Sequence, residues 1–333
     1  MYLVGIHRQA LSGLQMSTSS PIPDRLPTRI GLGLAALGRP GYINLGHASD
    51  LAGRTDVESM ERRAHAVLDA AYDRGVRYFD AARSYGKAEA FLASWLDARQ
   101  LGAGEVTVAS KWGYTYTAGW RVDAERHEVK DLSVTTLRRQ LAESRELLGP
   151  HLLLYQIHSA TLESGVLDDS AVLEELRRLR ESGLAIGVTV TGAHQAETIE
   201  RALEVGAFDT IQATWNLLER SAGPVLAEAH AGGLGVIVKE ALANGRLTAR
   251  GGLPTLLELS DRREVAPDAL ALAAVLAQPW ADVVLSGAAT VETLRSNLTA
   301  LELELGERLD PELEALAEKP ARYWEERATL PWN

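Results

Sequence analysis

The stretch LLLYQIHSATLESGVLDDSAVLEELRRLRESGLAIGVTVTG, residues 152–192, contains the unit from which the fold is built. It begins with an apolar run without alternation, which is typical of a parallel strand buried on both faces. Leu173, Leu176 and Leu179 then line one face of an amphipathic helix whose other face is charged. Gly183 ends this helix, and a second apolar run follows. The stretch therefore predicts a strand, a helix and a second parallel strand.

The same alternation runs along most of the chain. Apolar strand-like runs occupy 29–34, 76–80, 105–110, 152–158, 185–189, 210–213, 235–238 and 283–286. Amphipathic helical patterns lie between them, for example at 61–74, 88–98, 133–148, 170–182, 193–205, 224–231 and 291–303. Eight strands alternating with eight helical segments, without a linker, predict the α/β class and a single (β/α)₈ TIM barrel.

A doubly wound open sheet is the alternative architecture. It would require a G-x-G-x-x-G fingerprint between the first strand and the first helix. The glycines of GLGLAALG, residues 31–38, fall as G-x-G-x-x-x-x-G instead, which favours the barrel.

Two long connections, 112–131 and 240–265, follow the third and seventh strands. Because barrel enzymes build their sites from such loops at the C-terminal face, we expect both to contribute to a site. We assign 28–333 to the barrel and its C-terminal tail. Residues 1–27 are expected to be an N-terminal tail, either disordered or a start-site extension, since a second methionine lies at position 16.

Composition excludes several classes of function. The formal net charge is −11, from 34 basic and 45 acidic residues, and no basic cluster stands out, which argues against nucleic acid or an anionic membrane as the partner. There is no cysteine, so disulfides and thiolate chemistry are excluded. No apolar run reaches the ~18 residues of a membrane span. The eight histidines form no His-x-His pair, which argues against a metal-dependent hydrolase and predicts no metal site. We expect a cytoplasmic protein.

Four ionisable residues follow the predicted strands. They are Asp80, Tyr85, Lys111 and His158. Alone, each has an ordinary structural explanation, as a turn former, a packed aromatic, a surface lysine or a core histidine. In a barrel, however, all four lie at one face. A lysine lowers the pKa of a nearby phenol, an aspartate keeps the lysine charged, and a histidine can donate to a carbonyl oxygen. The group can exchange a proton with a carbonyl or alcohol, but it needs a cofactor to carry hydride.

Three segments carry a resemblance to a known family. FDAARSYG (79–86), ASKWG (109–113) and LLLYQIHS (152–159) resemble, in order and spacing, the catalytic segments of the aldo-keto reductase superfamily. The resemblance continues through IGVTVTG (186–192), IQATWNLLE (211–219), VKEALANGRLT (238–248) and LSGAATVETLRSNL (285–298). It implies that Tyr85 is the proton donor, that Lys111 and Asp80 lower its pKa, and that His158 orients the carbonyl of the substrate.

The resemblance also implies an NAD(P)(H) cofactor bound across the C-terminal face. The residues expected to contact it are Ser159, Thr189, Gln212, Trp215, Lys239, Ala241, Leu242, Asn244, Gly245, Leu247, Ser286, Gly287, Ala288 and Asn297. Two of these positions depart from the family pattern. Lys239 stands where an aromatic side chain often stacks on the nicotinamide, and SGAAT (286–290) lacks the Lys or Arg that often binds the 2′-phosphate of NADP. Family habit nevertheless favours NADP(H) over NAD(H).

The expected function is reduction of an aldehyde or ketone, or the reverse oxidation of an alcohol. The substrate pocket is expected to include Tyr42, Trp112 and Trp120, with the C-terminal tail at its rim. A nucleotide-binding regulatory barrel with little or no turnover is the alternative, although all four residues of the proton-transfer group are present. The partner is then a small-molecule carbonyl or alcohol. The sequence leaves open the substrate, the direction of the reaction and the oligomeric state.

Overall fold

The computed structural model describes residue 22, residues 26–306 and residues 308–333. The predicted N-terminal tail, 1–27, lies outside the described residues except for positions 22, 26 and 27.

Eight parallel strands close into a barrel in the order β1, β10, β9, β8, β7, β6, β3, β2. The predicted (β/α)₈ barrel is therefore confirmed. Its strands are β1 (Ile30–Gly33), β2 (Tyr78–Asp80), β3 (Thr107–Trp112), β6 (Leu152–Ala160), β7 (Ala185–Val190), β8 (Thr210–Thr214), β9 (Gly235–Lys239) and β10 (Val283–Ser286).

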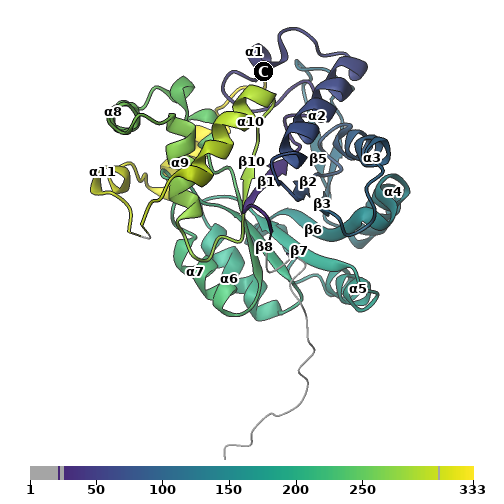
Figure 1. The fold of residues 1–333 in the computed structure, drawn as a ribbon. Coiled ribbons are helices and arrows are strands. Elements are labelled where there is room, and N and C mark those ends of the chain that lie inside the picture. Colours follow the sequence, from purple (N-terminus) through teal and green to yellow (C-terminus); the bar gives the residue numbers. More distant parts are fainter. Residues whose placement is uncertain (1–21, 23–25, 307) are drawn as a thin grey trace, which may run out of the picture.

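Helices surround the barrel (Figure 1). The helices that follow successive strands are α2 (Val57–Tyr72), α3 (Ala88–Ala98), α4 (Val134–Leu148), α5 (Ser170–Glu181), α6 (Gln195–Val205), α7 (Gly223–Ala231), α9 (Pro267–Leu276) and α10 (Val291–Leu298). Four further helices are α1 (His47–Leu51), α8 (Pro254–Arg263), α11 (Pro311–Glu314) and α12 (Pro320–Ala328). Short 3₁₀ turns are η1 (Gly149–His151), η2 (Leu162–Ser164), η3 (Ala243–Gly245), η4 (Ala249–Gly251) and η5 (Thr299–Glu302).

Two buried clusters hold the barrel together. The larger lies between the strands and the helices, as in α5, where Leu176 and Leu179 are buried. The smaller brings together side chains from β2, β3, β6, β9 and β10, as expected for residues that point into a barrel. Its members are Ile22, Tyr78, Ala109, Leu154, Ile237, Val283 and Leu285. Because side chains alternate along a strand, the two clusters use alternate positions.

The two long connections are structured. Residues 112–131 contain an antiparallel hairpin of β4 (Tyr114–Tyr116) and β5 (Glu128–Lys130), and residues 240–265 contain η3, η4 and α8. Helix α9 is not among the expected helices, because it is apolar on nearly all sides and lacks an amphipathic pattern. Within the described part of the chain, no helix is long and apolar enough to cross a membrane.

The C-terminal tail returns to the loop after β1. Asn333 and Tyr42 exchange two backbone hydrogen bonds of 3.1 and 3.2 Å. Trp332 stacks on His127 of the long third loop, with ring centroids 3.9 Å apart and planes 3° from parallel. The tail therefore joins the first and third loops of the C-terminal face.

Candidate active site

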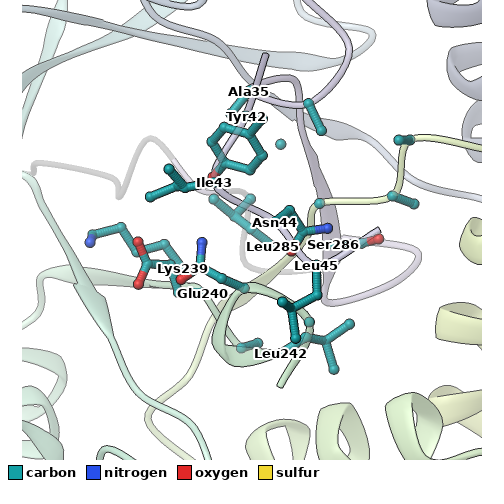
Figure 2. A pocket seen from close by; sticks show the side chains of 18 of the residues that line it. Ala35, Tyr42, Ile43, Asn44, Leu45, Lys239, Glu240, Leu242, Leu285 and Ser286 are labelled. Atoms are coloured by element: carbon teal, nitrogen blue, oxygen red, sulfur yellow. The ribbon is translucent and has the colours of Figure 1, made fainter. Parts of the chain in front are cut away.

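A cavity of about 740 Å³ opens where the strands end. Its wall includes Tyr85 and His158 on one side and Ser286 and Asn297 of β10 and α10 on another. Figure 2 shows the segment 42–45 facing the segment 239–242 across this cavity. We call the part near Tyr85 and His158 the reactive end, and the part formed by β10, α10 and Asp268 the distal end.

A buried ion pair lies beneath the reactive end. Asp80 is the last residue of β2 and is 2% exposed, and Lys111 of β3 is 1% exposed. The Lys111 ammonium donates to Asp80 Oδ1, and to the carbonyl oxygen of Ala81 at 3.0 Å. Asp80 Oδ2 accepts from Gln156 at 3.3 Å and from Gln212 at 3.0 Å. The two opposite charges thus cancel, and hydrogen bonds to neighbouring groups fix both side chains.

Tyr85 lies above this pair and contacts His158. Its hydroxyl oxygen is 3.5 Å from His158 Nε2, and the two rings meet edge to face at 5.5 Å. Burial, and then the Asp80 carboxylate, raise the pKa of Tyr85 above its ordinary value. This direction is opposite to the lowering expected from Lys111. Lys111 lies 4.9 Å from the ring centroid, against the ring, and Asp80 neutralises its charge. The phenol is therefore protonated at neutral pH and able to donate.

His158 is a neutral imidazole at neutral pH. Burial, and then the nearby cations Lys111, Lys239, Arg39 and Lys130, lower its pKa well below 6.5. Ser84 Oγ lies 3.5 Å from its other ring nitrogen, Nδ1. A neutral imidazole can donate one hydrogen bond to a carbonyl oxygen placed beside Tyr85.

Sequence reasoning missed the residues that enclose Tyr85. Arg39, only 3% exposed, donates to Ser84 O and to Glu128, both at 3.0 Å. Its guanidinium carbon lies 5.2 Å from the ring centroid of Tyr85 and 4.8 Å from that of Trp332. Tyr114 meets the ring of His158 at 5.0 Å. Tyr114 and Glu128 lie in the long loop 112–131, which the sequence indicates as part of a site without indicating these two side chains.

A second charged group occupies the reactive end. Lys239 ends β9, lines the cavity, and donates to Thr214 Oγ1 at 3.1 Å. The neighbouring Glu240 binds Arg327 of α12 through three hydrogen bonds of 2.5 to 3.0 Å. Burial lowers the pKa of Lys239 to about 8, opposed by the Glu240 carboxylate.

Most of the residues expected to contact a cofactor do line the cavity. They are Ser159, Thr189, Gln212, Lys239, Ala241, Leu242, Asn244, Gly245, Ser286, Gly287, Ala288 and Asn297, and Tyr42 of the expected substrate pocket joins them. Ser159 has a positive φ of 57°, and its N–H donates to Thr189 Oγ1 at 2.7 Å. The amide of Asn297 lies 2.8 Å from the Ser286 hydroxyl.

Four expected residues lie elsewhere. Trp112 is fully buried among the core side chains, because it follows Lys111 on β3 and alternation turns it toward the helices. Trp120 packs on Phe91 and donates to the carbonyl of Thr55 at 2.6 Å. The other two, Trp215 and Leu247, are buried in the core, with Trp215 edge-on to Trp280 at 5.5 Å. These four residues therefore do not line the cavity, and the contacts expected of Trp215 and Leu247 with the cofactor and of Trp112 and Trp120 with the substrate stay predictions.

Two loops of the cavity wall contact each other. The N–H of Leu45 donates to the carbonyl of Asn244 at 3.0 Å. Arg250 donates to Leu45 O at 3.0 Å and forms a two-pronged ion pair with Asp50, of which one contact is 2.9 Å. We call these contacts between 44–50 and 244–250 the strap.

The distal end is acidic. Asp268 and Glu292 line it, and Arg295 does not reach the cavity wall. Among the residues that the structure describes, no group of three His, Cys, Asp or Glu side chains could hold a metal ion.

Comparisons with known proteins agree with this architecture. A family model described as the aldo/keto reductase family matches residues 29–318. A protein named uncharacterized oxidoreductase YqkF, from Bacillus subtilis, is 27% identical over 263 residues, covering 72% of this chain and 82% of its own. D-threo-aldose 1-dehydrogenase from a Pseudomonas species is 29% identical over 240 residues, covering 66% of this chain and 69% of its own. The structure titled aldo-keto reductase AKR11C1 from Bacillus halodurans, in its holo form, superposes with a TM-score of 0.64 at 20% identity, covering 87% of this chain and 92% of its own.

Proposed function

Because the chain belongs to the aldo/keto reductase family and is an oxidoreductase, we propose that it reduces a small aldehyde or ketone with NAD(P)H, or runs the reverse oxidation, with Tyr85 as the proton donor. The observation that carries the proposal is the Tyr85 hydroxyl 3.5 Å from His158 Nε2, on the wall of a cavity and above the buried ion pair of Asp80 and Lys111. Both side chains can reach one carbonyl oxygen.

The residues present fit a dinucleotide cofactor. The wall of the cavity includes Tyr85, residues of the strap and residues of α10. The Asn244 side-chain oxygen is buried without a partner among the described residues, and a Cβ at Gly287 would meet open space. Ser159 and Gln212 would hold the nicotinamide amide, the loop 241–245 the pyrophosphate, and Ser286 to Ala288 with Asn297 the adenosine. When bound, the cofactor supplies or accepts the hydride.

The chain itself handles the proton. In reduction, the carbonyl oxygen accepts hydrogen bonds from Tyr85 and His158, which polarise the C=O bond. As negative charge develops on that oxygen, the Tyr85 O–H bond breaks and its proton forms the new alcohol O–H bond. The resulting phenolate lies against the Lys111 ammonium, whose position Asp80 fixes. Oxidation of an alcohol reverses these steps.

The choice between NADP(H) and NAD(H) depends on the distal end. Family habit favours NADP(H), and this stays a prediction. The charges argue for NAD(H), because Asp268 and Glu292 line that end and the nearby Arg250 is already paired with Asp50. A 2′-phosphate is best held by a free Arg or Lys.

The test is turnover of an aldehyde panel with NADH and NADPH, followed by absorbance of the reduced nicotinamide. We expect Tyr85→Phe to lower kcat by roughly 10²–10⁴-fold, the usual contribution of a general acid. Cofactor affinity, measured by titrating protein fluorescence, should stay within about 3-fold, which corresponds to less than ~1 kcal/mol. Turnover retained by Tyr85→Phe would refute the proton-donor role. Tight cofactor binding without turnover of any carbonyl or alcohol would favour the regulatory barrel.

A further inference from the structure

Among the residues that the structure describes, one cation on the cavity wall is in no ion pair with a carboxylate. The cavity-lining cations are Arg39, Lys239, Arg250 and Arg327. Each arginine is paired: Arg39 with Glu128 at 3.0 Å, Arg250 with Asp50 at 2.9 Å, and Arg327 with Glu240 at 2.5 Å. Lys239 is in no ion pair within 4.0 Å among the described residues. Its charge is therefore in excess in a protein whose formal net charge is −11.

The contacts of Lys239 explain why its charge stays unbalanced. Its ammonium has one neutral hydrogen-bond partner, the Thr214 hydroxyl at 3.1 Å. Glu240, the nearest carboxylate in the sequence, is hydrogen-bonded to Arg327, so the carboxylate that could balance Lys239 already balances another cation. An ammonium group has three donors, so the bond to Thr214 leaves two without an acceptor among the described residues, and the Trp324 ring centroid lies 5.8 Å from the nitrogen.

Lys239 belongs to the reactive end rather than to the distal end. It donates to Thr214 of β8 at 3.1 Å, and Gln212 of the same strand donates to Asp80 Oδ2 at 3.0 Å, so Lys239 lies on the side of the cavity that holds the buried ion pair. The charged and titratable groups that face it from the surrounding elements are Glu240, Arg327, Lys111, Asp80 and His158. Arg39, also on this part of the wall, keeps a buried Nε–H without an acceptor among the described residues. The reactive end thus offers N–H donors and a surplus of positive charge to whatever occupies it.

We propose that the carbonyl substrate carries a carboxylate, and that Lys239 binds this carboxylate and so selects oxo acids over neutral aldehydes and ketones. The proposal rests on the proposed function of the same cavity. Binding would complete the ion pair that Lys239 lacks, and the N⁺–H···O⁻ bond is of the stronger, charge-assisted kind. The carboxylate takes no part in the reaction: only the carbonyl carbon and oxygen gain hydride and proton.

The charge of Lys239 depends on pH, and this dependence can be measured. Burial lowers its pKa to about 8, so the side chain is cationic at pH 7 and loses its charge as the pH rises through 8. A bound carboxylate favours the charged form and raises this pKa. Carboxylate affinity should therefore be full below about pH 7 and fall as the pH rises above about 8.

The first experiment measures binding without turnover. Benzoate and butyrate, with benzamide and butyramide as neutral analogues, are titrated by calorimetry into the wild type, Lys239→Met and Lys319→Met, in the presence of saturating NAD⁺ or NADP⁺, whichever binds. Lys319 is exposed and outside the cavity wall, so its variant controls for the loss of one positive charge. We expect an acid to bind roughly 10–100-fold more tightly than its amide, as for a hydrogen bond to a charged group. Lys239→Met should remove this preference and its pH dependence, and Lys319→Met should keep both.

The second experiment compares substrates that differ only in charge. These are 4-carboxybenzaldehyde against methyl 4-formylbenzoate, and 4-oxobutanoate against its methyl ester. We expect the wild type to have a KM at least 10-fold lower for the acid than for the ester in one or both pairs. Lys239→Met should remove this difference in KM, and Lys319→Met should keep it. Circular dichroism and thermal unfolding confirm that the variant is folded.

The outcomes separate this inference from the proposed function. If esters and acids are reduced with equal KM, or if Lys239→Met keeps the acid preference, the carboxylate proposal is overturned while carbonyl reduction stands. If Lys239→Met weakens NADH binding 10-fold but leaves benzoate binding unchanged, Lys239 binds the cofactor rather than the substrate and the proposal is again overturned. If no aldehyde of either kind is reduced but benzoate binds through Lys239, the site assignment holds and the proposed function fails.

Discussion

The buried pair of Asp80 and Lys111 permits a quantitative prediction of stability. Removing one partner leaves an uncompensated buried charge, which costs about 3–5 kcal/mol of the free energy of unfolding. After Lys111→Met, the Asp80 carboxylate keeps the amide donors of Gln156 at 3.3 Å and Gln212 at 3.0 Å. After Asp80→Asn, the Lys111 ammonium keeps the carbonyl of Ala81 at 3.0 Å. We therefore expect a loss near ~3 kcal/mol for Lys111→Met and near ~5 kcal/mol for Asp80→Asn.

The double variant tests whether these losses come from the pair. With both charges gone, no buried ion remains, so the combined loss should fall short of the sum by at least ~2 kcal/mol. Urea unfolding, followed by tryptophan fluorescence and by far-UV circular dichroism, measures all four proteins, and coincidence of the two probes is required before free energies are compared. Additive losses, or a smaller loss for Asp80→Asn than for Lys111→Met, would refute the reasoning.

Three further predictions concern the cavity. Asp50→Asn removes one ion pair of the strap and should raise the Kd of the cofactor by roughly 3- to 5-fold, as expected for a partly exposed pair. Asp73→Asn, which removes an ion pair elsewhere, is the control. An unchanged Kd and an unchanged dissociation rate in stopped flow would show that the strap does not retain the cofactor. NADH should bind more tightly than NADPH, and Glu292→Gln should narrow this difference in fluorescence titrations; tighter binding of NADPH to the wild type would restore the NADP(H) prediction. Because the pKa of His158 is lowered well below 6.5, the pH profile of kcat/KM should show no inflection near pH 6.5. An inflection near pH 6.5 that is present in the wild type and absent in His158→Gln would contradict a neutral imidazole.

The barrel could be predicted because each of its strands is a short apolar run. Residues 152–158 read as a strand buried on both faces, and the structure has β6 at Leu152–Ala160. Helix α9 is harder to predict from the sequence, because PDALALAAVL is apolar on nearly every side and shows no apolar pattern with a 3.6-residue period. The hairpin of β4 and β5 pairs Tyr114 with Lys130, and the polar residues between these strands conceal the pairing in the sequence.

The proximity of Asp80, Tyr85, Lys111 and His158 could be predicted because strand ends meet at one face of a barrel, and their role in proton transfer stays a proposal. Period-two alternation could also have excluded Trp112, which follows the inward-facing Lys111. The wall of the reactive end could not be predicted in this way. Arg39 reaches Glu128 across 89 positions of the chain, and Trp332 reaches Arg39 from the C-terminal tail. Such contacts depend on how loops from distant segments fold over the barrel.

The charge of Lys239 shows most clearly what the sequence conceals. In the sequence, Lys239 and Glu240 are adjacent and look like a balanced pair. The structure directs the carboxylate of Glu240 to Arg327 on α12, nearly ninety residues later, and leaves the ammonium with a threonine hydroxyl. The charge at the distal end has the opposite sign, because among the described residues Asp268 and Glu292 line this end and the cavity-lining arginines are already paired. We therefore expect the cavity to favour a negative group at the reactive end and to disfavour an added phosphate at the distal end. The two preferences rest on different side chains, so Lys239→Met should leave the choice between NADH and NADPH unchanged, and Glu292→Gln should leave the preference for carboxylates unchanged.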